Sequence, residues 1–167
     1  EGWSDEYNGY LSSLMERNLS RTTINDRKKV VKDFILYLSG KGLEHSDLIG
    51  PEHVDSYLLQ FKDNSIKYRA AILCVIKDYL GYLYENGIGV EKSNTEASKW
   101  YTKAAEQGDT LAQNNLGSMY REGKGVQKDV DEAARWFRIA ASQGSKLAQY
   151  NLAIMYLTGS GVPQDEA

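Results

Sequence analysis

Residues with reactive or metal-binding side chains are scarce in this sequence, which holds one cysteine and two histidines. Cys74 has no second cysteine with which to form a disulfide, and its apolar neighbours indicate a small buried hydrophobic side chain. His45 and His53 have no cysteine near them, so a zinc-type ligand set is not expected. No combination of serine, histidine and aspartate has supporting context. We therefore predict neither a metal nor another cofactor, and no enzymatic activity.

Long apolar runs and an excess of one charge are also missing. No run approaches the roughly 20 apolar residues that a membrane span needs, and residues 1–3 do not resemble the start of a signal peptide. Location in the cell is not predicted. The sequence has 11 basic and 13 acidic residues before residue 86, and 9 basic and 10 acidic residues after it. Neither half carries the basic excess that is typical of strong nucleic-acid binders.

Helical periodicity is what the sequence does contain, and only two prolines are present to interrupt it. The stretch 66–90 is central. Its residues 70–76, AAILCVI, are apolar on every face, as in a helix that is buried on both sides. We predict one continuous helix over 66–86, which closes a helical domain at 1–86 and opens a repeat array at 66–167. The predicted fold class is all-α.

Three further helices are predicted before the shared helix. Apolar residues at helical spacing mark the first over 4–17. Ser20 is a suitable N-cap for the second, which extends to about Ser39, where glycines stop it. Pro51 suits the first turn of the third. The first module is therefore predicted to be a bundle of four helices of unequal length.

The segments YLSSLMERNLSRTTINDRKKVVKDFILYLSGKG, IGPEHVDSYL and SIKYRAAILCVIKDYLGYLYENG resemble the N-terminal core-binding (SAM-like) domain of tyrosine recombinases and phage integrases. The resemblance covers about residues 5–86. It implies that the second and fourth helices contact a DNA duplex. The implied DNA-binding residues are Arg21, Thr23, Lys28, Lys67, Arg69 and Lys77.

These residues have an alternative interpretation as solvated polar positions of amphipathic helices. The net negative charge of the module favours that alternative, because duplex binding depends on the neutralisation of phosphates. The catalytic domain of a recombinase is absent from the sequence. DNA cleavage is therefore not expected, and any duplex binding is expected to be weak.

The second half of the sequence repeats with an offset of 36 residues. Gly81 corresponds to Gly117, and Trp100 corresponds to Trp136. A Gly-x-Gly-Val turn begins at residues 87, 123 and 159. Glycine inside a helix costs about 1 kcal/mol relative to alanine. We therefore expect a neighbouring helix to approach closely at Gly117.

The segment LAQNNLGSMYREGKGVQKDVDEAARWFRIAASQG resembles the Sel-one-like repeat, which is related to the tetratricopeptide repeat. The resemblance covers about residues 73–167 and implies an α/α solenoid that binds protein partners on a concave surface. The third repeat stops at 164–167, so we expect the helix at 146–158 to keep an uncovered apolar face and to favour self-association. The groove positions implied by the related repeats are Asp78, Tyr82, Glu85, Asn114, Ser118, Arg121, Tyr150, Ile154 and Leu157.

Three functional hypotheses follow from these patterns. The first is an engineered fusion of two natural helical domains with no evolved activity, suggested by the change of pattern inside one helix, the incomplete third repeat and the lack of an initiator methionine. The second is a natural scaffold that binds a peptide in the repeat groove. The third is weak, non-specific binding of duplex DNA by the N-terminal module.

Overall fold

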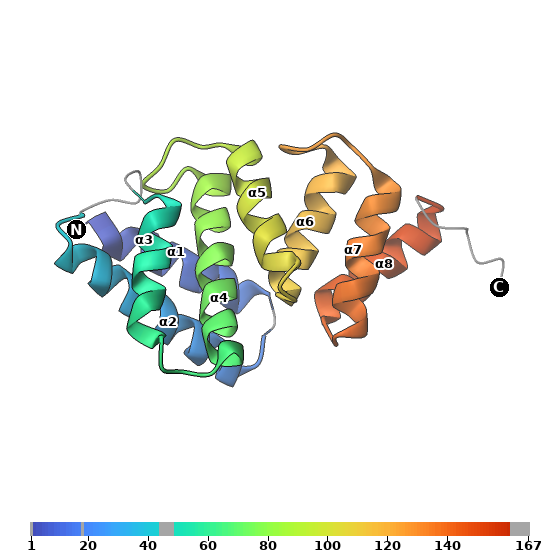
Figure 1. Ribbon diagram of the computed structural model, residues 1–167. Coiled ribbons are helices and arrows are strands. Elements are labelled where there is room, and N and C mark those ends of the chain that lie inside the picture. Colours follow the sequence, from blue (N-terminus) through green and yellow to red (C-terminus); the bar gives the residue numbers. More distant parts are fainter. Residues whose placement is uncertain (1, 18, 44–48, 161–167) are drawn as a thin grey trace.

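The computed structural model describes residues 2–17, 19–43 and 49–160. These residues form a row of helices with the N-terminal segments at one end and the C-terminal segments at the other (Figure 1). No strand occurs in this part of the chain, as the sequence predicts. None of the helices in it combines the length and apolar content that crossing a membrane requires. His45 lies outside the described residues.

The first helices match the expected order. They are α1 (Gly2–Glu16), α2 (Arg21–Gly40) and α3 (Pro51–Leu58), and α3 continues into a short 3-10 turn at Leu59–Phe61. Ser20 caps α2 as predicted, because its side chain accepts a hydrogen bond from the Thr23 amide at 3.0 Å.

Helix α4 (Ile66–Asn86) is unbroken over 21 residues, in agreement with the prediction of one continuous helix at this position. Ser65 caps its N-terminus, and Gly87 ends it with φ +66°. Both sides of α4 are covered. Tyr10 of α1 and Trp100, which follows α4 in the sequence, belong to the same apolar core as Tyr79 and Leu80 of α4. The division into two domains at 1–86 and 66–167 stays a prediction.

Four helices follow α4. They are α5 (Asn94–Ala105), α6 (Thr110–Glu122), α7 (Val130–Ser142) and α8 (Lys146–Thr158). Helix α4 packs most closely with α5, and α6 with α7. The N-cap residues of α5 and α7 are also 36 residues apart. The Ser93 hydroxyl accepts from the Glu96 amide at 3.2 Å, and the Asp129 carboxylate accepts from the Glu132 amide at 2.9 Å. The same capping chemistry therefore starts α5 and α7.

Gly81 in α4 and Gly117 in α6 mark close packing between neighbouring helices, as the sequence predicts for Gly117. A Cβ atom on Gly117 would lie 2.8 Å from the ring of Phe137 in α7. A Cβ atom on Gly81 would lie 2.6 Å from the ring of Tyr101 in α5. Tyr101 and Phe137 are 36 residues apart, and both are fully buried. The first two repeats therefore both place an aromatic ring of their second helix against a glycine of their first helix.

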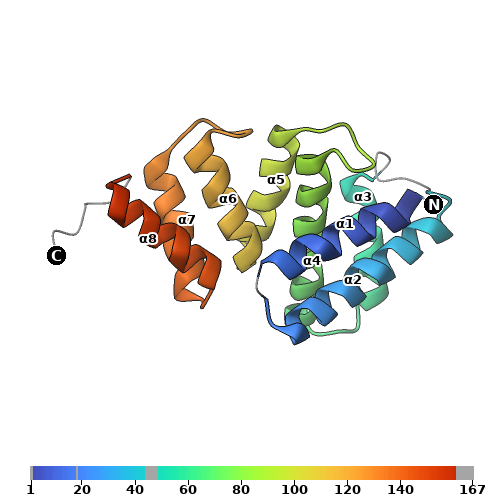
Figure 2. The same ribbon diagram turned by 180° about the vertical axis from the view of Figure 1, so that it is seen from behind.

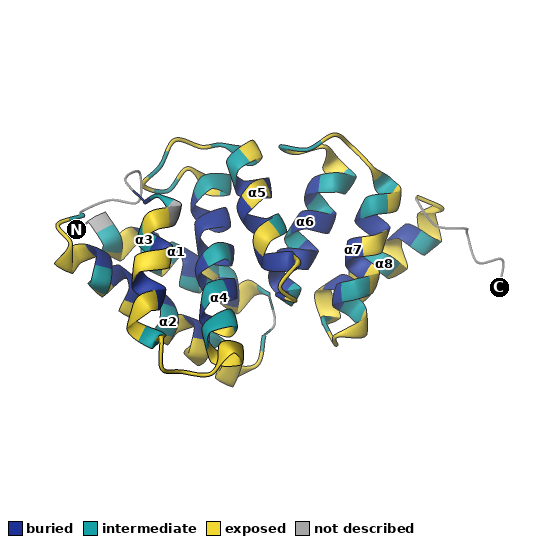
Figure 3. Cartoon of the chain, in the orientation of Figure 1, coloured by how far each residue is buried: buried dark blue, intermediate teal, exposed yellow. Residues whose placement is uncertain are grey.

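Burial decreases towards the C-terminal end of the row. Figure 3 shows continuous buried stretches on α4 and α6, whereas α8 is mostly intermediate or exposed. Within α8, Ala148 and Met155 are buried. Tyr150, Ile154 and Leu157 keep 64%, 37% and 73% of their surface exposed. This exposure agrees with the expected uncovered face of the helix at 146–158.

Candidate functional site

The nine predicted groove positions lie on the first helix of each repeat, and we call the surface that they define the repeat face. Its three thirds differ in accessibility. The α4 third is largely covered, the α6 third is partly covered and the α8 third is open. The α4 positions are Asp78, Tyr82 and Glu85, the α6 positions are Asn114, Ser118 and Arg121, and the α8 positions are Tyr150, Ile154 and Leu157.

The chain itself covers the α4 third, which corrects part of the groove prediction. Asp78 is fully buried and Tyr82 is 9% exposed. Helix α1 crosses α4 on this side (Figure 2). The Tyr10 ring packs against Tyr82 with 5.4 Å between centroids, and the Tyr10 hydroxyl donates to Asp78 Oδ2 at 2.8 Å. Asp78 and Tyr82 are therefore unavailable to a partner. Glu85 is half-buried and accepts a hydrogen bond from the Tyr101 hydroxyl at 2.7 Å.

A buried ionic network fixes this arrangement. Arg27 of α2 is 8% exposed. Its Nη1 donates to Asp78 Oδ2 at 3.0 Å and to the Tyr10 hydroxyl at 3.3 Å, while its Nη2 donates to Asp109 Oδ2. The other Asp109 oxygen accepts from the amides of Leu111 and Ala112, at 3.0 and 2.9 Å, and so caps α6. One guanidinium thus connects α1, α2, α4 and the start of α6.

The charged groups in this network shift one another's pKa values. Burial lowers the pKa of Arg27, but Asp109, Tyr10 and Asp78 outweigh that effect and raise it, so Arg27 stays charged. Burial raises the pKa of Asp78. The residues that form this network were not among those predicted from the sequence to act together. A signal was present, since Arg27 stands in the apolar stripe between Ile24 and Val31 at helical spacing.

The α6 third of the repeat face is held by polar contacts to α8. Asn114 is buried and accepts from the Asn151 side-chain amide at 2.9 Å. Arg121 Nη1 donates to Asn151 Oδ1 at 3.3 Å, and the Arg121 guanidinium lies 5.6 Å from the centre of the Phe137 ring. Asn151 therefore links the middle of α6 to α8. The same residue holds the Arg121 guanidinium against α8.

A cavity of about 490 Å³ lies beside the repeat face. It is bounded by the end of α1 and the start of α2 on one side, and by the starts of α6 and α8 on the other. Figure 2 shows these four helix ends converging. Arg17, Thr23 and Lys146 contribute polar side chains, and Leu19, Leu111 and Leu147 contribute apolar ones. Thr23 was predicted to contact DNA, and the structure places it in this cavity instead.

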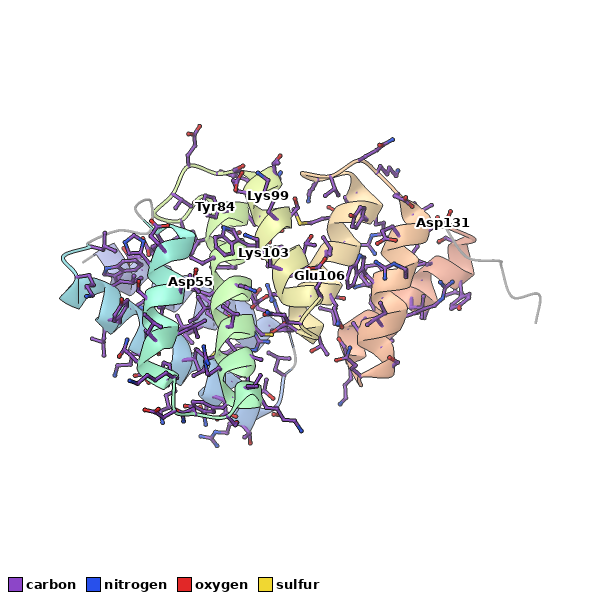
Figure 4. All side chains as sticks on the ribbon, in the orientation of Figure 1. Asp55, Tyr84, Lys99, Lys103, Glu106 and Asp131 are labelled. Carbon is purple, nitrogen blue, oxygen red and sulfur yellow. The ribbon has the colours of Figure 1, made fainter. Side chains whose placement is uncertain are left out.

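The other residues of the DNA prediction lie on α2 and α4. Arg21, Lys28 and Lys67 are exposed, and Arg69 is half-buried. Lys77 lies on a different side, where Lys103, Glu106 and Asp55 act on it. Burial lowers the pKa of Lys77. In the 36-residue repeat, Lys77 corresponds to Gln113. Asp55, Lys103 and Glu106 are labelled in Figure 4 on α3, on α5 and beyond its end. The structure therefore does not gather the predicted set into one basic patch.

The reactive side chains noted in the sequence have structural contacts. The Cys74 thiol donates to the Gln107 carbonyl oxygen over 3.7 Å, and burial raises the pKa of this thiol to about 11, which makes it a poor nucleophile at neutral pH. His53 Nδ1 accepts from the Gly50 amide at 3.0 Å. The described residues contain no cluster of three or more metal-binding side chains.

The comparisons with known proteins decide the family. The model of the Sel1 repeat matches residues 79–109, 110–145 and 146–167, which is more than half of the chain. The chain belongs to the Sel1 repeat family. This confirms the predicted Sel-one-like resemblance. Sel1 repeat proteins are helical scaffolds that typically bind protein partners.

Solved structures support the same assignment. A Sel1 repeat protein from Oxalobacter formigenes is 35% identical, with a TM-score of 0.52, over 66% of this chain and 44% of that one. A protective antigen of uropathogenic Escherichia coli that displays an SLR fold is 29% identical, with a TM-score of 0.57, over 94% of this chain and 30% of that one. This chain thus spans less than half the length of either protein. No curated protein sequence matches it.

The second of these matches extends beyond the three Sel1 repeats into the N-terminal helices, because it covers 94% of the chain. The matches named above do not show a recombinase-like domain in those helices. The recombinase resemblance and the engineered fusion inferred from it stay predictions.

Proposed function

We propose that this chain is a non-enzymatic scaffold that binds a segment of a partner protein on the α6 and α8 thirds of the repeat face. The observation that supports it best is the contrast along that face. The α4 third is covered by α1, whereas α8 presents Tyr150, Ile154 and Leu157 and holds the guanidinium of Arg121. Aromatic and arginine side chains supply most of the binding energy in protein interfaces.

The shape of this surface suits an extended or helical peptide. Tyr150, Ile154 and Leu157 recur at spacings of four and three residues, so they form one stripe along α8. Arg121 and Ser118 lie on α6, and Arg121 contacts Asn151, the neighbour of Tyr150 in the sequence of α8. A partner segment with apolar side chains would cover the stripe. The polar backbone and side-chain groups of that segment would then face α6. This combination of an apolar centre and a polar border is typical of protein interfaces.

A peptide-library screen with matched variants tests this proposal. We expect Tyr150→Ala and Leu157→Ala each to weaken selected peptides at least about tenfold, since both side chains would be buried by the partner. Tyr68→Ala and Leu59→Ala are the matched controls, because these residues are 48% and 66% exposed, at the start of α4 and in the 3-10 turn after α3, away from α6 and α8. Binding is measured by fluorescence anisotropy. Equal losses in the two pairs, or a failure to select any peptide, would contradict the proposal.

Three finer hypotheses stay secondary. Weak duplex binding by Arg21, Lys28 and Lys67 is supported by the recombinase resemblance alone. The hypothesis of an engineered fusion is supported by the overlap of two sequence patterns within α4. The hypothesis of self-association is supported by the exposed apolar stripe on α8. We place peptide binding first because the family assignment and the surface of α6 and α8 both favour it.

A further inference from the structure

The cavity between the α1–α2 junction and the starts of α6 and α8 differs in charge from the rest of the molecule. The protein has a net charge of −3. Among the described residues that line this cavity, two are basic, Arg17 and Lys146, and none is acidic. A region with two cations and no carboxylate in its lining attracts anionic groups.

Helix ends add to this attraction. Helices α2 and α8 both begin at the cavity, and both have serine as the N-cap. Ser20 and Ser145 are neutral, so they leave the partial positive charge of each helix start uncompensated. Helix α6 differs, because its cap Asp109 supplies a carboxylate that Arg27 already neutralises. By their position in the first turn, the amides of Lys146 and Leu147 have no acceptor within α8.

Arg17 supplies an independent observation. Its Nη1 atom is buried and has no hydrogen-bond partner among the described residues. Burial lowers the pKa of Arg17, but nearby groups, with Asp78 the strongest and Glu85 among them, outweigh that effect and raise it. The guanidinium is therefore charged at every accessible pH. Arg17 lines the cavity and is only partly buried, so the accessible part of its charged side chain can donate to an anionic ligand there.

The remaining lining indicates the kind of anion. Leu19, Leu111 and Leu147 lie in the same cavity as the two cations. Leu147 is 36% exposed and starts the helix that carries the apolar stripe of the repeat face. A small inorganic anion would leave these leucines without contacts. A peptide can instead place an acidic side chain near Arg17 and an adjacent apolar side chain against the leucines.

We propose that this cavity binds an acidic side chain of the partner peptide, with an apolar residue next to it. The proposal rests on the peptide-binding function above and adds its specificity. The acidic group accepts from Arg17 and lies near Lys146 and the start of α8. The chain of the partner then continues along α8 towards Tyr150.

Two peptide pools test this specificity. The acidic pool contains eight-residue peptides that alternate aspartate or glutamate with leucine, isoleucine or valine. The neutral pool replaces each acid by its amide, so that size and apolar content stay matched. We expect the acidic pool to bind at least about tenfold more tightly, since hydrogen bonds between two charged groups are stronger than neutral ones. We also expect this preference to weaken with salt, because exposed charges are screened over about 8 Å at physiological ionic strength.

Variants then assign the preference to the cavity. Arg17→Gln is expected to reduce binding of the acidic pool about tenfold. Lys146→Gln is expected to reduce it about threefold, because Lys146 is exposed and surface charges contribute less. Lys146→Gln also covers the case in which Arg17→Gln impairs folding, which circular dichroism reports. Lys128→Gln is the control, since Lys128 is an exposed cation outside the cavity.

The outcomes separate the two proposals. If the pools bind equally and Lys146→Gln has no effect, while Tyr150→Ala still weakens binding, the acidic specificity is wrong and the scaffold function stands. If neither pool binds and the library screen also fails, both proposals are overturned. If inorganic phosphate competes with the acidic pool at equal concentration, the cavity binds simple anions and the peptide assignment is overturned.

Discussion

Replacing Arg27 by methionine is expected to lower the free energy of unfolding by about 3–5 kcal/mol. Methionine fills most of the space of the arginine stem. It leaves the carboxylates of Asp78 and Asp109 without the cation that they share. These two residues are only 0% and 6% exposed. An unpaired buried charge costs far more than a surface ion pair contributes. Urea unfolding followed by circular dichroism measures the change.

Two further variants separate the network from simple side-chain loss. Lys28→Met is the matched control, because Lys28 is the exposed neighbour of Arg27 on α2, and we expect it to change stability by less than about 0.5 kcal/mol. Combining Arg27→Met with Asp78→Asn and Asp109→Asn removes the unpaired charges while an asparagine can still cap α6. We expect this triple variant to regain much of the loss. A loss below about 1 kcal/mol for Arg27→Met alone would show that the network is not stabilising.

Replacing Phe137 by alanine is expected to lower the free energy of unfolding by about 3–5 kcal/mol, as is usual for a buried phenylalanine. Phe137 is fully buried, and its ring occupies the space that the missing side chain of Gly117 leaves. The contact joins α6 to α7, the two helices of one repeat, so its loss weakens the packing within that repeat. The measurement is again urea unfolding followed by circular dichroism.

The effect of Gly117→Ala should depend on whether Phe137 is present. With Phe137 in place, the new Cβ would lie 2.8 Å from the ring, so we expect a destabilisation of about 1–3 kcal/mol from overpacking. In the Phe137→Ala background the ring is gone, and alanine should stabilise the helix by up to about 1 kcal/mol. A destabilisation of equal size in both backgrounds would mean that the ring does not determine the need for glycine.

Much of the fold could be predicted because its determinants are local or periodic. The serine and aspartate caps, the glycine turns and the 36-residue offset each act within one repeat, so the sequence displays them directly. The continuity of α4 followed from an apolar run without a helix breaker. The close approach at Gly117 followed from the cost of an internal glycine.

The accessibility of the repeat face could not be predicted in the same way. Periodicity assigns Asp78, Asn114 and Tyr150 to equivalent positions, but α1 covers the first and leaves the last open. That difference depends on contacts between residues far apart in sequence, such as Tyr10 with Asp78 and Arg27 with Asp109. The cavity near Arg17 arises for the same reason, because its walls come from α1, α2, α6 and α8.

Both functional proposals require that the N-terminal helices and the Sel1 repeats form one cooperative body, so that α1 covers Asp78 and positions Arg17 permanently. Native-state hydrogen exchange measures this most directly, since it reports the free energy of opening for each helix. We expect the buried amides of α1 and α2 to exchange with the same opening free energy as those of α4 and α6. If α1 and α2 instead exchange through a much less costly opening while α4–α7 stay protected, the central claim is contradicted.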